Sequence, residues 1–167
     1  DAAGGGETSG MTLMLMSGAT VAFAPGAHTL GALGGIGSVT ADDLSVAGLK
    51  QVTSTNPADA LALAATLTVA ADAAWTLAVT SGGVAPLRSA AGIAFLGGGT
   101  LDVTGAAGLS EGAHLLAEAV GGASLTGFTA SAWSVSSDDG TRQYTVYSDG
   151  DAVYLRVSGK GTLLLLH

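Results

Sequence analysis

The dominant pattern along the chain is an alternation of apolar residues with small or polar ones at every second position. It runs through Met11 to Met16, Ala19 to Phe23 and Trp75 to Thr80, among other segments. Successive side chains of a β-strand point to opposite faces, so this period predicts strands with one buried face. Gly, Asp or Asn follows most of the runs, which predicts short strands joined by tight corners.

The Ala-rich stretch from Ala58 to Ala74 is the one serious helix candidate, because Asn56 or Asp59 could cap it. Within it, however, Leu and Val occupy alternate positions from Leu61 to Val69, with Thr on the other face. The same alternation resumes directly after Asp72. We therefore expect two strands with a tight connection here rather than a helix.

The last third of the chain contains the clearest hairpin signal. Tyr144 to Tyr147 and Val153 to Val157 both alternate, and an Asp-Gly pair lies between them at Asp149 and Gly150. Thr162 to His167 is predicted to form a final apolar strand.

Loose internal repeats favour a stacked architecture. Segments 65–79 and 99–116 share a Thr-Leu-x-Val core that recurs 34 residues later. Repeats of this kind are typical of the coils of a parallel β-solenoid, in which small corner residues let the backbone stack closely. The expected fold class is all-β, a solenoid with a C-terminal hairpin cap, and a β-sandwich is the alternative. We expect a flexible segment or linker over 1–10, solenoid coils over 11–127, and a cap with the hairpin and final strand over 128–167.

Composition excludes several classes of function. The formal net charge is −8, and the five Lys and Arg residues are dispersed, so no basic surface for nucleic acid is expected. The chain contains no Cys, which excludes catalysis by a thiol. A secreted chain without disulfides also favours a bacterial source. No apolar run approaches the ~20 residues that a membrane-spanning helix needs, and the N-terminal ten residues do not resemble a signal peptide.

Two segments resemble a known family. The runs "ATVAFAPGAHTLGALGGIGSVTADDLSVAGL" (19–49) and "GTLDVTGAAGLSEGAHLLAEAVGGASLTGF" (99–128), the latter followed by a Trp-Ser-Val strand and "DAVYLRV" (151–157), are similar to bacterial autotransporter passengers. The likeness covers most of 12–157, without a translocator barrel after it. It implies a right-handed parallel β-helix, export from the cell, and a structural or adhesive role at the cell surface or outside it.

No catalytic or metal-binding pattern stands out, and we expect no enzyme activity and no cofactor. His28, His114 and His167 do not have ligand spacing, and the first two follow the same Gly-Ala pair, so a structural role is expected. No nucleophile-elbow or phosphate-binding glycine motif is present. Ca²⁺ is the weakest alternative, with oxygen ligands from Asp138, Asp139, Asp149 and Asp151, although turn residues facing water are the favoured interpretation.

Aromatic residues are concentrated in the last third of the chain. Trp133, Tyr144, Tyr147 and Tyr154 are expected either to cap the narrow core or to face a ligand such as a surface glycan. A carbohydrate-binding module attached to a polysaccharide-active protein is accordingly the alternative function.

The apolar strands at the two ends are the expected assembly elements. Leu13 and Leu15 lie in the first, and Leu163 and Leu165 in the last. An uncovered strand is a template for another chain. The sequence thus predicts a structural or adhesive segment of an exported bacterial protein that pairs with itself or with the rest of a longer polypeptide and inserts into no membrane, and that can form filaments by strand addition.

Overall fold

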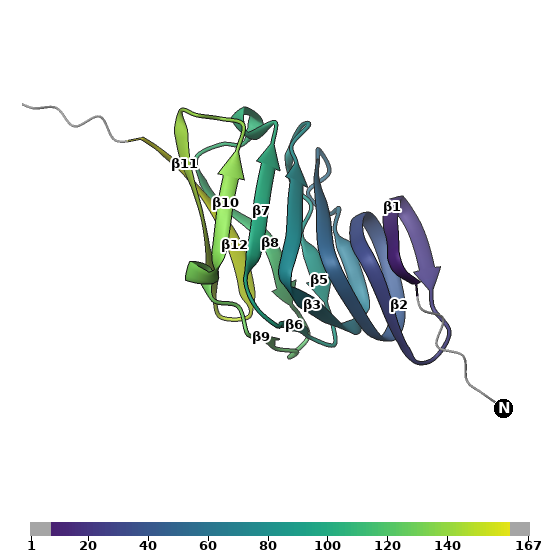
Figure 1. The fold of residues 1–167 in the computed structure, drawn as a ribbon. Helices are drawn as coiled ribbons and strands as arrows, with labels where there is room; N and C mark the ends of the chain where they lie inside the picture. Colours follow the sequence, from purple (N-terminus) through teal and green to yellow (C-terminus); the bar gives the residue numbers. More distant parts are fainter. Residues whose placement is uncertain (1–7, 161–167) are drawn as a thin grey trace, which may run out of the picture.

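The computed structural model describes residues 8–160 and is all-β (Figure 1). The strands are β1 (Thr8–Ala22), β2 (Ala27–Ser54), β3 (Leu61–Ala78), β4 (Gly83–Val84), β5 (Leu87–Ser89), β6 (Ile93–Phe95), β7 (Gly99–Thr104), β8 (Gly112–Ala119), β9 (Leu125–Thr126), β10 (Trp133–Ser137), β11 (Arg142–Asp149) and β12 (Ala152–Gly159). Two 3-10 turns, η1 (Ala106–Gly108) and η2 (Ala130–Ala132), interrupt them. All twelve strands belong to one mixed sheet whose main path runs β1-β2-β3-β5-β8-β12-β11.

Most neighbouring strands are parallel, and three stacks of paired segments result. In the first stack, residues 37–40 of β2 pair with 61–64 of β3. Residues 61–63 pair in turn with β5, and β5 pairs with 117–119 of β8. A second stack joins 43–46, 66–69, β6 and β9. A third joins 48–52, 74–78, β7 and β10. The long strands β2 and β3 thus contribute to all three stacks and bend between them.

The core consists of apolar side chains aligned across each stack. Leu44, Leu67 and Ile93 occupy matched positions in the second stack and are almost fully buried. Leu49, Trp75 and Leu101 do the same in the third. Neighbouring strands lie ~4.8 Å apart, so each inward side chain rests directly on the equivalent one in the next segment. The two-residue alternation in the sequence therefore becomes continuous apolar rows, each residue worth about 1.5–3 kcal/mol of burial.

The helix candidate is a strand. Residues 61–69 alternate between buried and more exposed positions within β3, as the sequence predicted. Asp72 has a positive φ of 57°, which turns the strand before the alternation resumes at Trp75. The tight connection predicted after Asp72 is thus a left-handed corner inside one long strand.

The two segments that share the Thr-Leu-x-Val core pair in parallel, with 73–78 against 99–104, so the two cores themselves are not in register. Leu67 pairs with Ile93, whereas Leu101 pairs with Trp75. The two segments therefore resemble each other because each forms a strand with one buried face. Their resemblance does not predict which residues pair.

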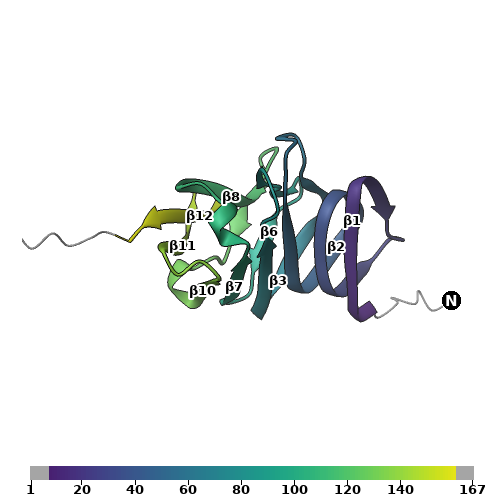
Figure 2. The same ribbon diagram turned by 90° about the horizontal axis from the view of Figure 1, so that it is seen from above.

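The C-terminal end departs from the parallel arrangement. β12 runs antiparallel to both β8 and β11, and the predicted hairpin is present with Gly150 and Asp151 as its two-residue loop. Figures 1 and 2 show β10, β11 and β12 at the opposite end of the molecule from β1. The predicted final strand over 162–167 lies outside the described residues. β1 begins at Thr8, inside the segment predicted to be a linker.

Close backbone stacking fixes glycine at particular positions. A Cβ atom on Gly98 would lie 1.8 Å from the carbonyl oxygen of Ala132, whereas one on Gly83 would have no atom within 4 Å. The chain at Gly98 therefore approaches its neighbour more closely than any other residue type allows.

Replacing Gly98 by Ala should lower the free energy of unfolding by about 2 kcal/mol, because the added methyl group forces two backbone segments apart. Gly83→Ala is the matched control and should change it by less than about 0.5 kcal/mol. Urea unfolding followed by tryptophan fluorescence measures both. Equal effects of the two substitutions would contradict this account of the stacking.

Candidate functional site

The most distinctive surface in the structure is the outer edge of β1. β1 pairs with β2 on one side and is the first strand in the sheet order, and among the described residues no strand pairs with its other edge. Its straight segments, 12–15 and 19–22, are separated by a register shift at the corner. Their outward-facing N–H and C=O groups form the kind of template on which another strand adds.

The side chains of β1 make this edge apolar. Leu15 points into the core and is 6% exposed, and Leu13 is partly buried beside it. Met11, Met14 and Met16 are 45%, 46% and 82% exposed. These are all the methionines in the chain, and no charged residue occurs from Thr8 to Ala22. Edge strands are usually protected by charge or proline, and this one has neither.

The core is thinly covered at the same end. Leu13, Val21 and Phe23 are only partly buried, whereas Leu30 and Leu33, one segment further in, are fully buried. The structure thus brings together the two N-terminal residues predicted for assembly, Leu13 and Leu15. Leu163 and Leu165 lie outside the described residues.

The opposite end is closed by a polar network. Asp139 accepts hydrogen bonds from Arg142 Nε at 2.6 Å and from the Tyr144 hydroxyl at 2.8 Å. Arg142 also donates to the carbonyl oxygens of Ala106 (2.9 Å) and Leu109, which ties β11 to the η1 turn. The sequence analysis missed this network. The only sequence feature that could have indicated it is the short spacing of Asp139, Arg142 and Tyr144 after a turn.

This network shifts the acid–base behaviour of its members. Hydrogen bonds from Thr141, and then from Arg142 and Tyr144, hold the pKa of the Asp139 carboxyl well below its usual range. Burial, followed by the hydrogen bond to Asp139, raises the pKa of Tyr144 to about 12. In the folded chain neither group therefore gains or loses its proton near neutral pH, and the protonation of each is linked to folding.

The four aspartates considered for Ca²⁺ are not grouped as metal ligands in the described part of the chain. Asp138 accepts the backbone N–H groups of Gly105 (2.6 Å) and Ala106 (2.9 Å), which lower its pKa, and Asp151 accepts that of Leu125 (2.9 Å). Across residues 8–160, no three His, Cys, Asp or Glu side chains are grouped so that they could hold a metal ion. Asp138, Asp139 and Asp151 thus accept hydrogen bonds from backbone N–H groups of turns and loops.

The aromatic residues divide into an inner and an outer set. Trp133 is 7% exposed and packs with Trp75, Phe95 and Phe128, with ring centroids 5.7–5.9 Å from its own. Its indole N–H has no hydrogen-bond acceptor among the described residues, and the ring stands edge-on to Trp75 and Phe95 at 76° and 86°. Trp133 therefore belongs to the core.

Tyr147 and Tyr154 form the outer set. They are directly opposite each other on β11 and β12 and stack at 5.3 Å with an interplanar angle of 17°. The Arg156 guanidinium lies 5.8 Å from the Tyr147 ring. Both tyrosines are half-buried, and the alternate residues of β12, Val153 and Leu155, fill the core, so this pair faces outward.

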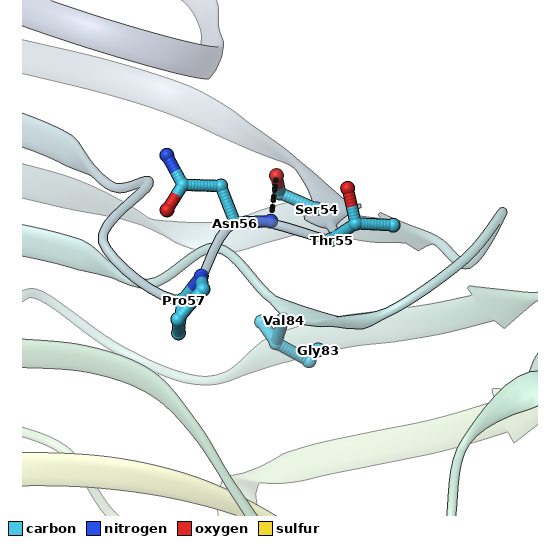
Figure 3. A pocket seen from close by; sticks show the side chains of 6 residues that line it. All are labelled: Ser54, Thr55, Asn56, Pro57, Gly83 and Val84. Carbon is cyan, nitrogen blue, oxygen red and sulfur yellow. Dashed lines mark hydrogen bonds between the residues drawn. The ribbon is translucent and has the colours of Figure 1, made fainter.

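A shallow pocket of about 210 Å³ lies between two loops (Figure 3). It is lined by Ser54, Thr55, Asn56, Pro57, Gly83 and Val84. The Ser54 hydroxyl donates to Asp59 at 2.6 Å and accepts the Asn56 N–H at 3.1 Å, and the Asn56 amide donates to Asp59 at 3.0 Å. Ser54 and Asn56 in the lining are thus engaged in holding the loop. Sequence analysis did not single this loop out.

His28 and His114 have equivalent contacts. The Nε2 atom of each lies 2.7–2.8 Å from the carbonyl oxygen four residues earlier, that of Ala24 or Ser110. The repeated Gly-Ala-His pattern thus reflects a repeated corner, as predicted for these two residues.

Comparison with protein-family models, curated proteins and solved structures finds no match to this chain. Over residues 8–160, no helix is long and apolar enough to cross a bilayer.

The Tyr144 pKa leads to a prediction at alkaline pH. The folded value of about 12 lies above the ~10 expected for an unfolded chain, so the folded state holds the proton more tightly. This stabilisation is complete below about pH 10 and is lost as the pH rises from about 10 to about 12. Urea midpoints should fall across that window in the wild type and fall less steeply in Tyr144→Phe. Tyr147→Phe is the matched control and should keep the wild-type slope; identical slopes in Tyr144→Phe and wild type would refute the assignment.

Proposed function

We propose that this chain is a passive structural segment: the capped end of a stacked β-solenoid rod that joins another β-structure through the open edge of β1. The observation that carries this proposal is the contrast between the two ends. One ends in an uncharged strand whose outer edge pairs with no other described strand, over a thinly covered core. The other ends in an antiparallel hairpin tied down by Arg142 and Asp139.

Three features support a solenoid as the finer description of the fold. Successive chain segments pair in parallel with matched registers in three separate stacks. Apolar rows continue from segment to segment, and small residues lie where the backbone stacks most closely. Each repeat of such a fold contacts only its neighbours, so a rod of this type can be lengthened at any end that has no cap.

Export from a bacterium and display at or beyond the cell surface are proposed on the sequence. The chain has no Cys, few charges, and repeats similar to those of autotransporter passengers. A rod without thiols needs no oxidative folding step, which suits passage across an envelope before folding. Its role would be structural or adhesive, with no catalytic step.

Edge pairing predicts assembly that depends on concentration. Wild-type chain should form ordered assemblies visible by negative-stain electron microscopy. Thr12→Lys/Met16→Lys should leave single particles, because charges on an edge strand oppose pairing. Thr145→Lys/Gln143→Lys places the same charges on the exposed side of β11 and is the matched control, expected to behave as wild type. Monodisperse wild-type particles at every concentration would rule out assembly of this chain on itself.

Carbohydrate binding is a second candidate, favoured by one observation. Tyr147 and Tyr154 present aromatic rings and hydroxyl groups outward beside Arg156, and aromatic rings with polar neighbours are suited to contact sugar faces. Trp133, by contrast, is buried and unsuited to this role.

The second candidate has its own test. Binding to a glycan array should be lost in Tyr147→Ala/Tyr154→Ala, since both stacking surfaces disappear. Thr145→Ala/Gln143→Ala, on the same strand, serves as the control and should bind as wild type does. Absence of glycan binding by the wild-type chain would leave the structural proposal alone.

A further inference from the structure

We propose that β1 is a site of reversible oxidation, at which hydroperoxides convert Met11, Met14 and Met16 to methionine sulfoxide while the chain stays folded. The apolar surface of this strand thereby becomes polar. The inference rests on the proposed function in one respect: the surface that changes belongs to the edge proposed to join another β-structure.

All the sulfur atoms of this chain lie in one strand. The chain contains no Cys, and its three methionines all fall within β1. Among residues 8–160, four large hydrophobic side chains are exposed, and three of them are these methionines; the fourth is Leu96. The buried core consists of other apolar residues and contains no Met. The oxidisable groups are therefore concentrated where an oxidant in solution can reach them.

The pairing of β1 with β2 explains why the three methionines are exposed. Met14 pairs with Gly34, which has no side chain to lie beside it. A Cβ atom on Gly34 would lie 1.9 Å from the carbonyl oxygen of Lys50, so no larger residue fits at that position. Met11 and Met16 lie at the two register shifts of β1, where the pairing with β2 is interrupted. The exposure of these sulfur atoms is thus built into the fold.

The oxidation needs no catalytic group from the protein. A lone pair of the thioether sulfur attacks an oxygen of the hydroperoxide, the O–O bond breaks, and an S–O bond forms. The hydroperoxide proton moves to the departing oxygen, which leaves as water or an alcohol. Sulfur loses two electrons and the hydroperoxide gains them. A methionine sulfoxide reductase that uses a dithiol reverses the change, with water and a disulfide as products.

The sulfoxide changes the surface of β1 and leaves the core alone. Its S–O group is polar and accepts hydrogen bonds, so the side chain no longer suits an apolar contact. Leu15 is buried and Leu13 packs against the core, and neither contains sulfur. Because the three methionines are exposed before oxidation, adding oxygen to them displaces no buried atom. Oxidation should therefore weaken apolar contacts at this edge without unfolding the chain.

The rates of oxidation test the exposure of each sulfur atom in solution. Wild-type chain, diluted until electron microscopy shows single particles, is treated with hydrogen peroxide in buffer and in urea. Trypsin then releases all three methionines in one peptide, residues 1–50, and tandem mass spectrometry locates the added oxygen atoms. Met16 should oxidise almost as fast in the folded chain as in urea, and Met11 and Met14 about twofold slower, because susceptibility follows exposure.

Hydrophobic-interaction chromatography and urea unfolding test the consequence. Oxidised chain should be retained less strongly on the column, and its urea midpoint should equal that of untreated chain. Methionine sulfoxide reductase with a dithiol should restore the original retention. The triple variant Met11→Leu/Met14→Leu/Met16→Leu is the matched control: it keeps the apolar surface but has no sulfur, so peroxide should leave its retention unchanged.

Three results would overturn the oxidation site. One is oxidation of any of the three methionines about tenfold or more slower in buffer than in urea, because the sulfur would then react only after local opening. Another is a lower urea midpoint after oxidation. The third is an equal loss of retention in the triple leucine variant.

Electron microscopy separates this inference from the proposed function. Assembly of untreated chain that is lost on oxidation and regained on reduction supports both. Assembly that persists unchanged after complete oxidation contradicts apolar joining at the β1 edge, while the rates and the retention still support the oxidation site. Untreated chain that never assembles rules out self-assembly and likewise leaves the oxidation site standing on those two measurements.

Discussion

The structure depends on in-register parallel pairing of successive chain segments. The long strands β2 and β3 each contribute to all three stacks, so a change in register at one of their bends would displace the apolar side chains that follow it. Because parallel strands cannot be joined by two-residue turns, each segment is followed by a longer connection before the chain pairs with it in parallel. The composition follows from this constraint. Residues at the bends must be small or tolerate unusual backbone angles, whereas residues between them must alternate strictly.

Gln51 shows how the pairing accommodates irregularity. It is 4% exposed, and its side-chain oxygen accepts the Trp75 indole N–H at 2.8 Å. Its amide nitrogen donates to the carbonyl oxygens of Ala85 (3.2 Å) and Leu116 (2.6 Å). Leu116 lies where β8 is displaced against β12, between the paired residues Leu115 and Ala117, so its carbonyl needs another donor. One buried amide thus compensates for the transition from parallel stack to antiparallel cap, at a position where an apolar residue would leave three polar groups unpaired.

The alternation in the sequence was sufficient to predict the all-β class, the strand character of 61–78 and the hairpin around Gly150, because those depend on local pattern. Register was not predictable in the same way. Leu101 pairs with Trp75 rather than with Leu67, its equivalent in the shared Thr-Leu-x-Val core, since pairing depends on loop lengths and on distant contacts such as that between Gly98 and Ala132. The same limit applies to the sites. Leu13 and Leu15 could be singled out from a run without charge, whereas the burial of Trp133 and the contacts of Asp138 depend on segments more than 30 residues away.

A stack of equivalent segments has no intrinsic end, because its last strand offers the same hydrogen-bonding groups as any other. The chain resolves this differently at its two ends. At the C-terminal end, direction reverses in β12, aromatic rings fill the last layers, and the network of Arg142, Asp139 and Tyr144 fixes the hairpin over the core. β1 has no such reversal of direction and no such polar network: its fifteen residues carry no charge, and Leu13 is only partly buried. Solubility alone would have favoured a lysine or proline there. The lack of charge and proline along β1 and the half-covered Leu13 are therefore the features on which the proposal of pairing at this edge rests.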